Sequence, residues 1–417
     1  MTGEVYALRA QRAFDGTRFL SGGATVLVEG SRIVGVEPFG YDAPDGCEVS
    51  TFEGTLLPGL IDTHVHLVTD SGDFALDRVA GYTEGELDEV VTEALRRHLA
   101  AGVTTVRDLG DRGYASVDRR DRQGARDVVE PRIVASGPPV TTPGGHCHFM
   151  GGAVSGEEEI RAAVRERVER HVDVVKVMAS GGMATMGTDV TMPQFSLEQL
   201  RLLVEVVHAA GLPVAAHAHA AAAVDQAVAL GVDSIEHASY LVAAHQAGPG
   251  APPGGPVPSG ASDEQLELLA ASGIAVCPTL GGFSREALAS APPQILANMR
   301  RFGVTPESLF EARSSLLRRM MEAGVRFVSG ADAGIVPTKA HGMYAEAVLE
   351  LADVVPMVTA LASATSVAAE VCGLGEATGR LAEGFDADLL VVAGDPVADP
   401  GSLRHPVAVV LRGHRVT

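Results

Sequence analysis

The chain has 417 residues, 46% of them hydrophobic and only 4% aromatic, and its formal net charge is −21. An acidic balance of this size argues against a nucleic-acid or anionic-membrane partner, because the chain offers no basic field to neutralise phosphate groups. No apolar run reaches the ~18 residues that cross a bilayer, and the first residues lack a signal-peptide pattern. We expect a cytoplasmic protein that acts on a small molecule, and we also expect a homo-oligomer.

Both ends of the chain have the pattern of β-structure. Short β-prone runs with glycine-containing turns occur at 6–10, 24–29 and 32–38, and again at 387–392 and 407–412. Fragments of the same kind at opposite ends of a chain are expected to meet, with the termini close together. The sequence therefore predicts a small β-sandwich built from residues 1–57 and 376–417.

Strand-like and helix-like segments alternate between these ends. Eight apolar runs are expected as strands, at about 61–66, 103–107, 132–136, 173–178, 213–217, 233–237, 274–279 and 325–330. Amphipathic stretches are expected as helices, for example 87–101, 157–171, 197–210 and 221–230. The fold class is thus α/β, and eight such units predict a (β/α)8 TIM barrel over residues 58–375. Reactive side chains of that barrel lie at the C-terminal ends of its strands.

Two histidines stand two residues apart at the end of the first of these strands, in Pro-Gly-Leu-Ile-Asp-Thr-His-Val-His. Side chains alternate along a strand, so His64 and His66 are expected on one face. Two neighbouring imidazoles are half of a metal site. Because the motif is short, a purely structural histidine pair is an equally simple interpretation.

Lysine is rare in this chain, since thirty of the 32 basic residues are arginines and only Lys176 and Lys339 are lysines. Lys176 lies in an apolar strand-like run. Arginine keeps its proton, whereas a buried lysine can become neutral and nucleophilic. A neutral amine can add CO2 to give a carbamate, which is a bridging carboxylate ligand. The alternative is a lysine that extends from a strand end into solvent.

Three later strands end in further metal-binding side chains, His217, His237 and Asp332. Each one alone could be an ordinary core or loop residue. Their order along the chain, after a His-x-His pair and a buried lysine, is improbable by chance. The set predicts a metal centre at the strand ends.

The order and the local sequence resemble the amidohydrolase superfamily. The resemblance covers nearly the whole chain and is closest to the branch with prolidase-type and Xaa-Arg dipeptidases and imidazolonepropionase-like hydrolases. The matching segments are PGLIDTHVHL, AGVTTVRDLG, VVKVMASGG, VAAHAHAAAAVDQAVALGVDSIEHASYL, VCPTL, SGADAG and GRLAEGFDADLLVVAGDP.

This resemblance implies two divalent metal ions, most readily Zn, with Mn, Co or Fe as substitutes. One ion would be held by His64, His66 and Asp332 and the other by His217 and His237. The remaining candidate ligand, Lys176, would bridge the two ions as a carbamate. A metal-bridging hydroxide would attack the scissile carbonyl, and the aspartate would serve as general base and then as general acid.

The resemblance also suggests substrate contacts. His146, in Thr-Thr-Pro-Gly-Gly-His, matches a histidine that contacts the substrate carbonyl in related dipeptidases, with loop stabilisation as the alternative. Tyr240 looks like a substrate-binding tyrosine, with packing as the alternative. We interpret His219 as a residue that supports the site or starts the next helix. Arg107 and Asp108 are expected to form a structural ion pair.

Three loop features remain open. Met183, Met186 and Met192 either line an apolar pocket or pack their loop down. Residues 246–262 are rich in Pro and Gly and are either an inert insertion or a mobile lid. A substrate carboxylate could be held by Arg285 or Lys339, although neither is singled out by its local sequence.

The function that we predict is hydrolysis of an amide-type C–N bond, in a dipeptide or an N-acyl amino acid. One alternative is a mononuclear deaminase or a hydrolase of cyclic amides or imidazolones. Those relatives usually carry Glu three residues after the fifth-strand histidine, where this chain has Ala220, and they lack the bridging lysine. A second alternative is a non-catalytic scaffold, but no metal ligand is missing here.

Overall fold

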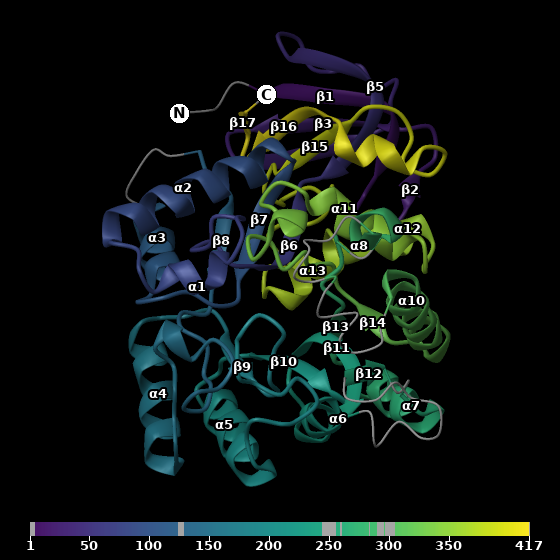
Figure 1. Ribbon diagram of the computed structural model, residues 1–417. Helices are drawn as coiled ribbons and strands as arrows, with labels where there is room; N and C mark the ends of the chain where they lie inside the picture. The colour runs from purple at the N-terminus through teal and green to yellow at the C-terminus, as the bar shows by residue number, and fades with distance from the viewer. Residues whose placement is uncertain are drawn as a thin grey trace.

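The computed structural model describes residues 5–123, 129–243, 256–258 (backbone only), 261–282, 284–289, 296 and 305–416. These residues form a mixed α/β fold (Figure 1). No helix in this part of the chain combines the length and the hydropathy that a membrane crossing requires. All four cysteines are free thiols. Most of segment 246–262, expected as either an inert insertion or a mobile lid, lies outside the described residues.

Strands from both ends of the chain pair in one eight-stranded sheet, seen at the top of Figure 1. Its members are β1 (Tyr6–Phe14), β2 (Phe19–Leu20), β3 (Ala24–Glu29), β4 (Arg32–Glu37), β5 (Glu48–Pro58), β15 (Leu389–Val392), β16 (Pro406–Leu411) and β17 (His414–Arg415). β15 runs antiparallel to β5, and the Tyr6 hydroxyl donates to the Gly413 carbonyl at 2.7 Å. The two ends thus lie together, while a separate β-sandwich unit with the predicted boundaries stays a prediction.

The prediction lacks β5, which is the longest strand of this sheet. Its first half, Glu-Val-Ser-Thr-Phe-Glu, is polar and only partly buried, so it has no apolar run to reveal it. Its second half is fully buried and leads through Gly59 directly into the next strand.

Eight parallel strands make up most of the remaining β-structure. They are β6 (Leu60–Val65), β7 (Val103–Asp108), β8 (Arg132–Ala135), β9 (Val175–Met178), β10 (Val214–Ala220), β11 (Ser234–Ala243), β13 (Ala275–Cys277) and β14 (Arg326–Phe327). Each coincides with a predicted strand within a few residues, except that β11 continues well past His237. A short additional strand, β12 (Pro256–Pro258), runs antiparallel to β11.

The parallel strands are hydrogen-bonded in the order β6-β7-β8 in one sheet and β9-β10-β11-β13-β14 in the other. Parallel bridges join the two sheets along both edges, from Val140 to Val177 and from Val65 to Ala333. All eight strands therefore point the same way, and their C-terminal ends lie on one side of the molecule.

Helices follow most of these strands and lie around them in Figure 1. They are α1 (Ala75–Val79), α2 (Glu84–Ala100), α3 (Ala115–Gln123), α4 (Glu157–Glu169), α5 (Leu197–Ala209), α6 (Ala221–Leu230), α7 (Asp263–Ser272), α8 (Arg285–Ala289), α10 (Pro306–Ala323), α11 (Tyr344–Ala352), α12 (Met357–Ser363) and α13 (Ser366–Val371), with 3-10 turns η1 (His148–Met150), η3 (Pro337–Lys339) and η4 (Pro400–Arg404). α5 shows why such a segment forms a helix. It begins with a capping box between Ser196 and Gln199, and it buries Leu200, Leu203, Val204 and Val207 at helical spacing.

A buried pair of histidines joins α2 to the segment before α11. His98 Nε2 and His341 Nδ1 lie 3.0 Å apart, and His341 Nε2 donates to the Thr69 carbonyl at 2.9 Å. His341 Nδ1 therefore accepts a hydrogen bond from His98 Nε2–H. Burial lowers the pKa of His341 to about 4 and the pKa of His98 well below its usual value of 6.5.

This pair should make the protein sensitive to acid. Below pH 6.5 these two histidines bind protons in the unfolded chain but stay neutral in the folded chain. The free energy of unfolding that is present above pH 6.5 therefore decreases as the pH falls. Each such histidine should cost about 2 kcal/mol between pH 7 and pH 5. We expect the loss of unfolding free energy over this interval, measured by denaturant titration, to be smaller by that amount in His98→Leu. The exposed replacement His414→Gln should leave the loss unchanged, and an unchanged loss in His98→Leu as well would contradict the prediction.

Candidate metal centre

The two histidines at the end of β6 face one carboxylate. His64 Nε2 lies 3.4 Å and His66 Nε2 lies 3.3 Å from Asp332 Oδ1, and the two rings are 5.3 Å apart. All three side chains are buried. The expectation that both histidines share a face is confirmed. This first group offers two nitrogens and one oxygen, which is a donor set that zinc and similar divalent ions accept.

Asp332 reaches the histidines because the segment after β14 packs tightly on β6. The Asp332 amide donates to the His64 carbonyl at 2.7 Å. Gly330 permits this approach, since a Cβ there would lie 2.7 Å from His64 Cβ and from Cys277 Sγ. Asp332 itself has a left-handed φ of 57°. A non-glycine residue held in that conformation is strained, and such strain is concentrated at functional sites.

Lys176, on β9, enters the same interior. Its Nζ lies 3.5 Å from His64 Nε2, and the side chain is 1% exposed. Burial lowers the pKa of Lys176. Within the described part of the chain the amine forms no salt bridge with a carboxylate. The side chain is therefore buried beside a candidate ligand and not extended into solvent, which is the environment that favours a neutral amine.

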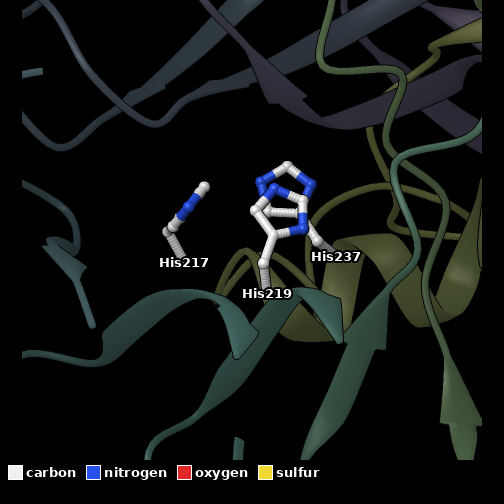
Figure 2. Close-up of side chains that lie close together, drawn as sticks. All are labelled: His217, His219 and His237. Carbon is white, nitrogen blue, oxygen red and sulfur yellow. The ribbon is translucent and has the colours of Figure 1, made fainter. Parts of the chain in front are cut away.

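A second group contains His217, His219 and His237, which Figure 2 shows together. The rings of His217 and His237 are 4.5 Å apart, and the ring of His219 stacks on that of His237 at 4.2 Å with an angle of 19°. Ligand atoms of all three lie within 4.8 Å of one another. Of the two interpretations of His219, the structure favours the one in which it supports the site. α6 has no side-chain cap at its N-terminus, and His219 Nδ1 instead contacts Ser239 Oγ at 3.0 Å.

Hydrogen bonds fix which nitrogen of each histidine in the first group is free. His64 Nδ1 lies 2.8 Å from the Glu236 carboxylate and His66 Nδ1 lies 3.1 Å from the Gly110 carbonyl. Both partners only accept, so each Nδ1 carries the proton. His64 Nε2 and His66 Nε2 are left facing Asp332, where they would serve as metal ligands. A second proton on either ring would be released on metal binding.

Hydrogen bonds also fix the free nitrogen of two histidines in the second group. His217 Nε2 donates to the Gly181 carbonyl at 3.2 Å, which leaves Nδ1 free. The Thr279 hydroxyl donates to the Pro278 carbonyl at 2.8 Å, so it accepts from His237 Nδ1 at 2.7 Å and leaves His237 Nε2 free. Four candidate ligands thus have one N–H committed to a fixed acceptor and one nitrogen available. This arrangement is characteristic of metal-binding histidines.

Burial and neighbouring charges set the protonation states of the cluster. Burial lowers the pKa of His64 to about 4 and lowers those of His217 and His237 well below 6.5. Burial alone would raise the pKa of Asp332, but the facing His64 and His66 hold it far below its usual range. Burial alone would lower the pKa of His66, but its hydrogen bond to Asp332 raises it. Near neutral pH, His64, His217 and His237 are therefore neutral imidazoles beside a carboxylate, the forms that bind divalent metals.

Glu236 is the main residue that the sequence analysis missed. It is 0% exposed, and its carboxylate lies between His64 and Arg107, whose guanidinium donates to Glu236 Oε1 at 3.0 Å. The expected ion pair between Arg107 and Asp108 is therefore wrong. Neighbouring residues on a strand point to opposite faces, and Asp108 instead accepts from the Leu67 amide at 2.8 Å.

His146 lies next to the second group. Its ring centroid is 4.6 Å from that of His217, and its Nδ1 is 2.8 Å from Thr185 Oγ1. Gly182 makes room for the ring, because a Cβ there would lie 2.4 Å from it. Tyr240 is completely buried, and burial raises its pKa. The position of His146 is compatible with substrate contact, whereas the role of Tyr240 stays a prediction.

The loop features have different outcomes. Met183, Met186 and Met192 are 67%, 94% and 51% exposed, so they do not pack their loop down. Lys339 Nζ donates to the carbonyls of Thr279 at 2.5 Å and Ala331 at 3.0 Å. These bonds join the segments after β13 and β14, so the amine binds the backbone and is not directed at a substrate carboxylate. The side chain of Arg285 lies outside the described residues.

The chain is similar to known proteins over most of its length. A family described as "Amidohydrolase family" matches residues 55–416. Ochratoxinase from Aspergillus niger is 25% identical over 385 residues, which cover 85% of this chain and 73% of that protein. Imidazolonepropionase from Micrococcus luteus is 27% identical over 328 residues, covering 72% and 70%. The crystal structure of a Xaa-Pro dipeptidase with bound methionine superposes with a TM-score of 0.83 at 25% identity, covering 99% of each chain.

Proposed function

Because the chain belongs to the amidohydrolase family and is thus an enzyme that acts on carbon–nitrogen bonds, we propose that it is a binuclear metallohydrolase on a (β/α)8 barrel. Its substrate would be the amide bond of a dipeptide or an N-acyl amino acid. The observation that carries the proposal is the buried cluster of four histidines, each with one nitrogen fixed by a hydrogen bond and one available, around Asp332 and Lys176.

The donor set fits two ions. His64, His66 and Asp332 would hold one ion, and His217 and His237 would hold the other. Lys176, as a carbamate, would supply the shared carboxylate oxygens, and its burial beside His64 supports this role. Nitrogen and oxygen donors of this kind suit Zn, and Mn, Co or Fe are alternatives.

When bound, the metal ions supply Lewis acidity that polarises the scissile carbonyl and lowers the pKa of the attacking water. Asp332 is the group that we assign to proton transfer. Its Oδ1 faces the two histidines, and within the described part of the chain no hydrogen bond engages Oδ2. As a carboxylate it accepts the proton of the attacking water and then donates it to the leaving amine.

The substrate would bind on the side of the second group. His146 would donate to the substrate carbonyl oxygen, because its ring adjoins that of His217. Met183 directly follows Gly182, which packs on the His146 ring, and Met183 is exposed. Flexible thioether side chains suit apolar groups of varied shape. We therefore propose that the substrate has an apolar side chain next to the scissile bond. Tyr240 stays a candidate for substrate binding.

The ring-hydrolase alternative has one finding in its favour, the relative named imidazolonepropionase. Against it stands Lys176, buried beside His64 where a mononuclear site would have no use for an amine. Ala220 also occupies the position at which the glutamate of those relatives is expected.

One experiment separates these functions. Protein purified without chelators would be analysed for metal content and assayed on Xaa-amino-acid dipeptides, N-acyl amino acids and cyclic amides. We expect about two divalent ions per chain, loss of amide hydrolysis on chelation, and recovery on adding Zn, Mn or Co. A single bound ion together with activity only on cyclic amides would replace this proposal with the ring-hydrolase alternative.

A further inference from the structure

Glu236 and His237 are consecutive in β11, yet both side chains reach His64 or its neighbours. The Glu236 carboxylate is 2.8 Å from His64 Nδ1, and the His237 ring is 5.5 Å from the His64 ring. In a regular strand, consecutive side chains point to opposite faces. Here His237 and Ala238 have left-handed φ values of 71° and 46°, and the pairing with β10 shifts register at this point. The distorted backbone thus turns both side chains toward the candidate metal centre.

Arg313 of α10 stabilises the distorted backbone at His237. One of its terminal nitrogens, Nη2, donates to the carbonyls of His237 and Pro278 at 2.7 Å each. These bonds tie the middle of β11 to the segment that follows β13. Left-handed conformations of non-glycine residues persist only where surrounding contacts impose them, and Arg313 supplies such contacts.

The Glu236 carboxylate has no freedom to leave His64. Its second oxygen accepts from Arg107 at 3.0 Å and from the Ser234 hydroxyl at 2.8 Å. Arg107 is itself fixed, because its Nε donates to the Thr63 carbonyl at 2.7 Å, next to His64 in the chain. The carboxylate is completely buried. A buried charge is retained only where such partners compensate it.

We propose that Glu236 is a positioning residue for metal binding, which fixes the ring orientation and the N–H of His64 so that His64 Nε2 faces the ion. The inference rests on the proposed function, since it takes His64 as a metal ligand. An imidazole whose N–H is bound to a carboxylate is a more basic and better oriented ligand. Because His237 is the next residue, this one distorted stretch of β11 would set a ligand at each of the two metal positions.

Glu236→Gln tests this inference, with Ser234→Ala as the matched control. Gln keeps the size of the side chain but loses the charge. Its NH2 group would face a hydrogen-bond donor, either His64 Nδ1 or Arg107, in place of an acceptor. Ser234→Ala removes one hydrogen bond to the carboxylate and leaves the contact with His64. The measurements are metal affinity by competition with a chromophoric chelator, and the visible absorption of the Co(II)-loaded protein.

We expect Glu236→Gln to weaken binding of one of the two ions by ~10–100-fold and to change the Co(II) spectrum. Ser234→Ala should stay close to wild type in both. If Glu236→Gln does not fold, Glu236→Gln/Arg107→Met removes the uncompensated charge and allows the same measurements, with the same expectation for metal affinity.

Two results would overturn the inference. In the first, a folded Glu236 variant has a lower melting temperature but keeps wild-type affinity for both ions and an unchanged Co(II) spectrum, so Glu236 only braces the fold. In the second, wild-type protein binds no metal, which removes the proposed function as well. The wild-type measurement therefore distinguishes failure of this inference from failure of the function on which it rests.

Discussion

Replacement of Asp332 by Asn is expected to leave a folded protein whose kcat is lower by ~10²–10⁴ or more, because proton transfer by a positioned group contributes that much to rate. Asn has nearly the same shape and can keep the 2.7 Å backbone contact between residue 332 and His64. It cannot accept the proton of the attacking water, and it is a poorer ligand than a carboxylate. The assay would be run at saturating metal so that weaker binding does not mimic a catalytic defect.

A control for this variant is Asp42→Asn, at an exposed position in the loop between β4 and β5 of the eight-stranded sheet. It removes the same charge and should leave kcat, metal content and melting temperature unchanged. Turnover of Asp332→Asn near the wild-type level at saturating metal would exclude Asp332 from the proposed mechanism, whatever its effect on metal affinity.

The strands and the gathering of the candidate ligands could be predicted because both depend on short-range rules. Apolar runs mark all eight parallel strands. Parallel strands end on one side of a sheet, so residues as distant in sequence as His64 and Asp332 are expected together once each is placed at a strand end. Their 3.4 Å separation agrees with that expectation.

The roles of Glu236 and His219 could not be predicted in the same way. Alternation along β11 would turn Glu236 away from His237, and only the left-handed backbone at His237 overrides it. For His219, alternation correctly gives the same face as His217. The sequence does not reveal that its ring contacts Ser239 Oγ and stacks on the ring of His237. A useful signal was present in Ile-Glu-His, since an acid inside an apolar strand needs a buried partner.

Replacement of Lys176 is the second change that we expect to lower activity strongly. We expect Lys176→Ala and Lys176→Met to lose the shared ligand and, with it, tight binding of at least one ion. Metal polarisation of a carbonyl is worth several kcal/mol, and each ~1.4 kcal/mol is tenfold in rate. Activity should therefore fall on the order of 10³-fold in both variants. Wild-type protein should carry the added mass of one CO2 under native conditions, lost on acidification.

The two variants should differ in chemical rescue, which is the sharper part of this prediction. Lys176→Ala leaves a cavity beside His64 that a small carboxylate can enter, so acetate or formate should restore part of the metal content and the activity. Lys176→Met fills the same space with an apolar side chain of similar length and should not be rescued. A general effect of added carboxylate on the protein would appear in both variants. If Lys176→Met keeps two ions and near-wild-type turnover, Lys176 is a packing residue and the binuclear proposal loses its bridge. Rescue of the alanine variant alone would instead establish that a carboxylate is needed at this point of the site.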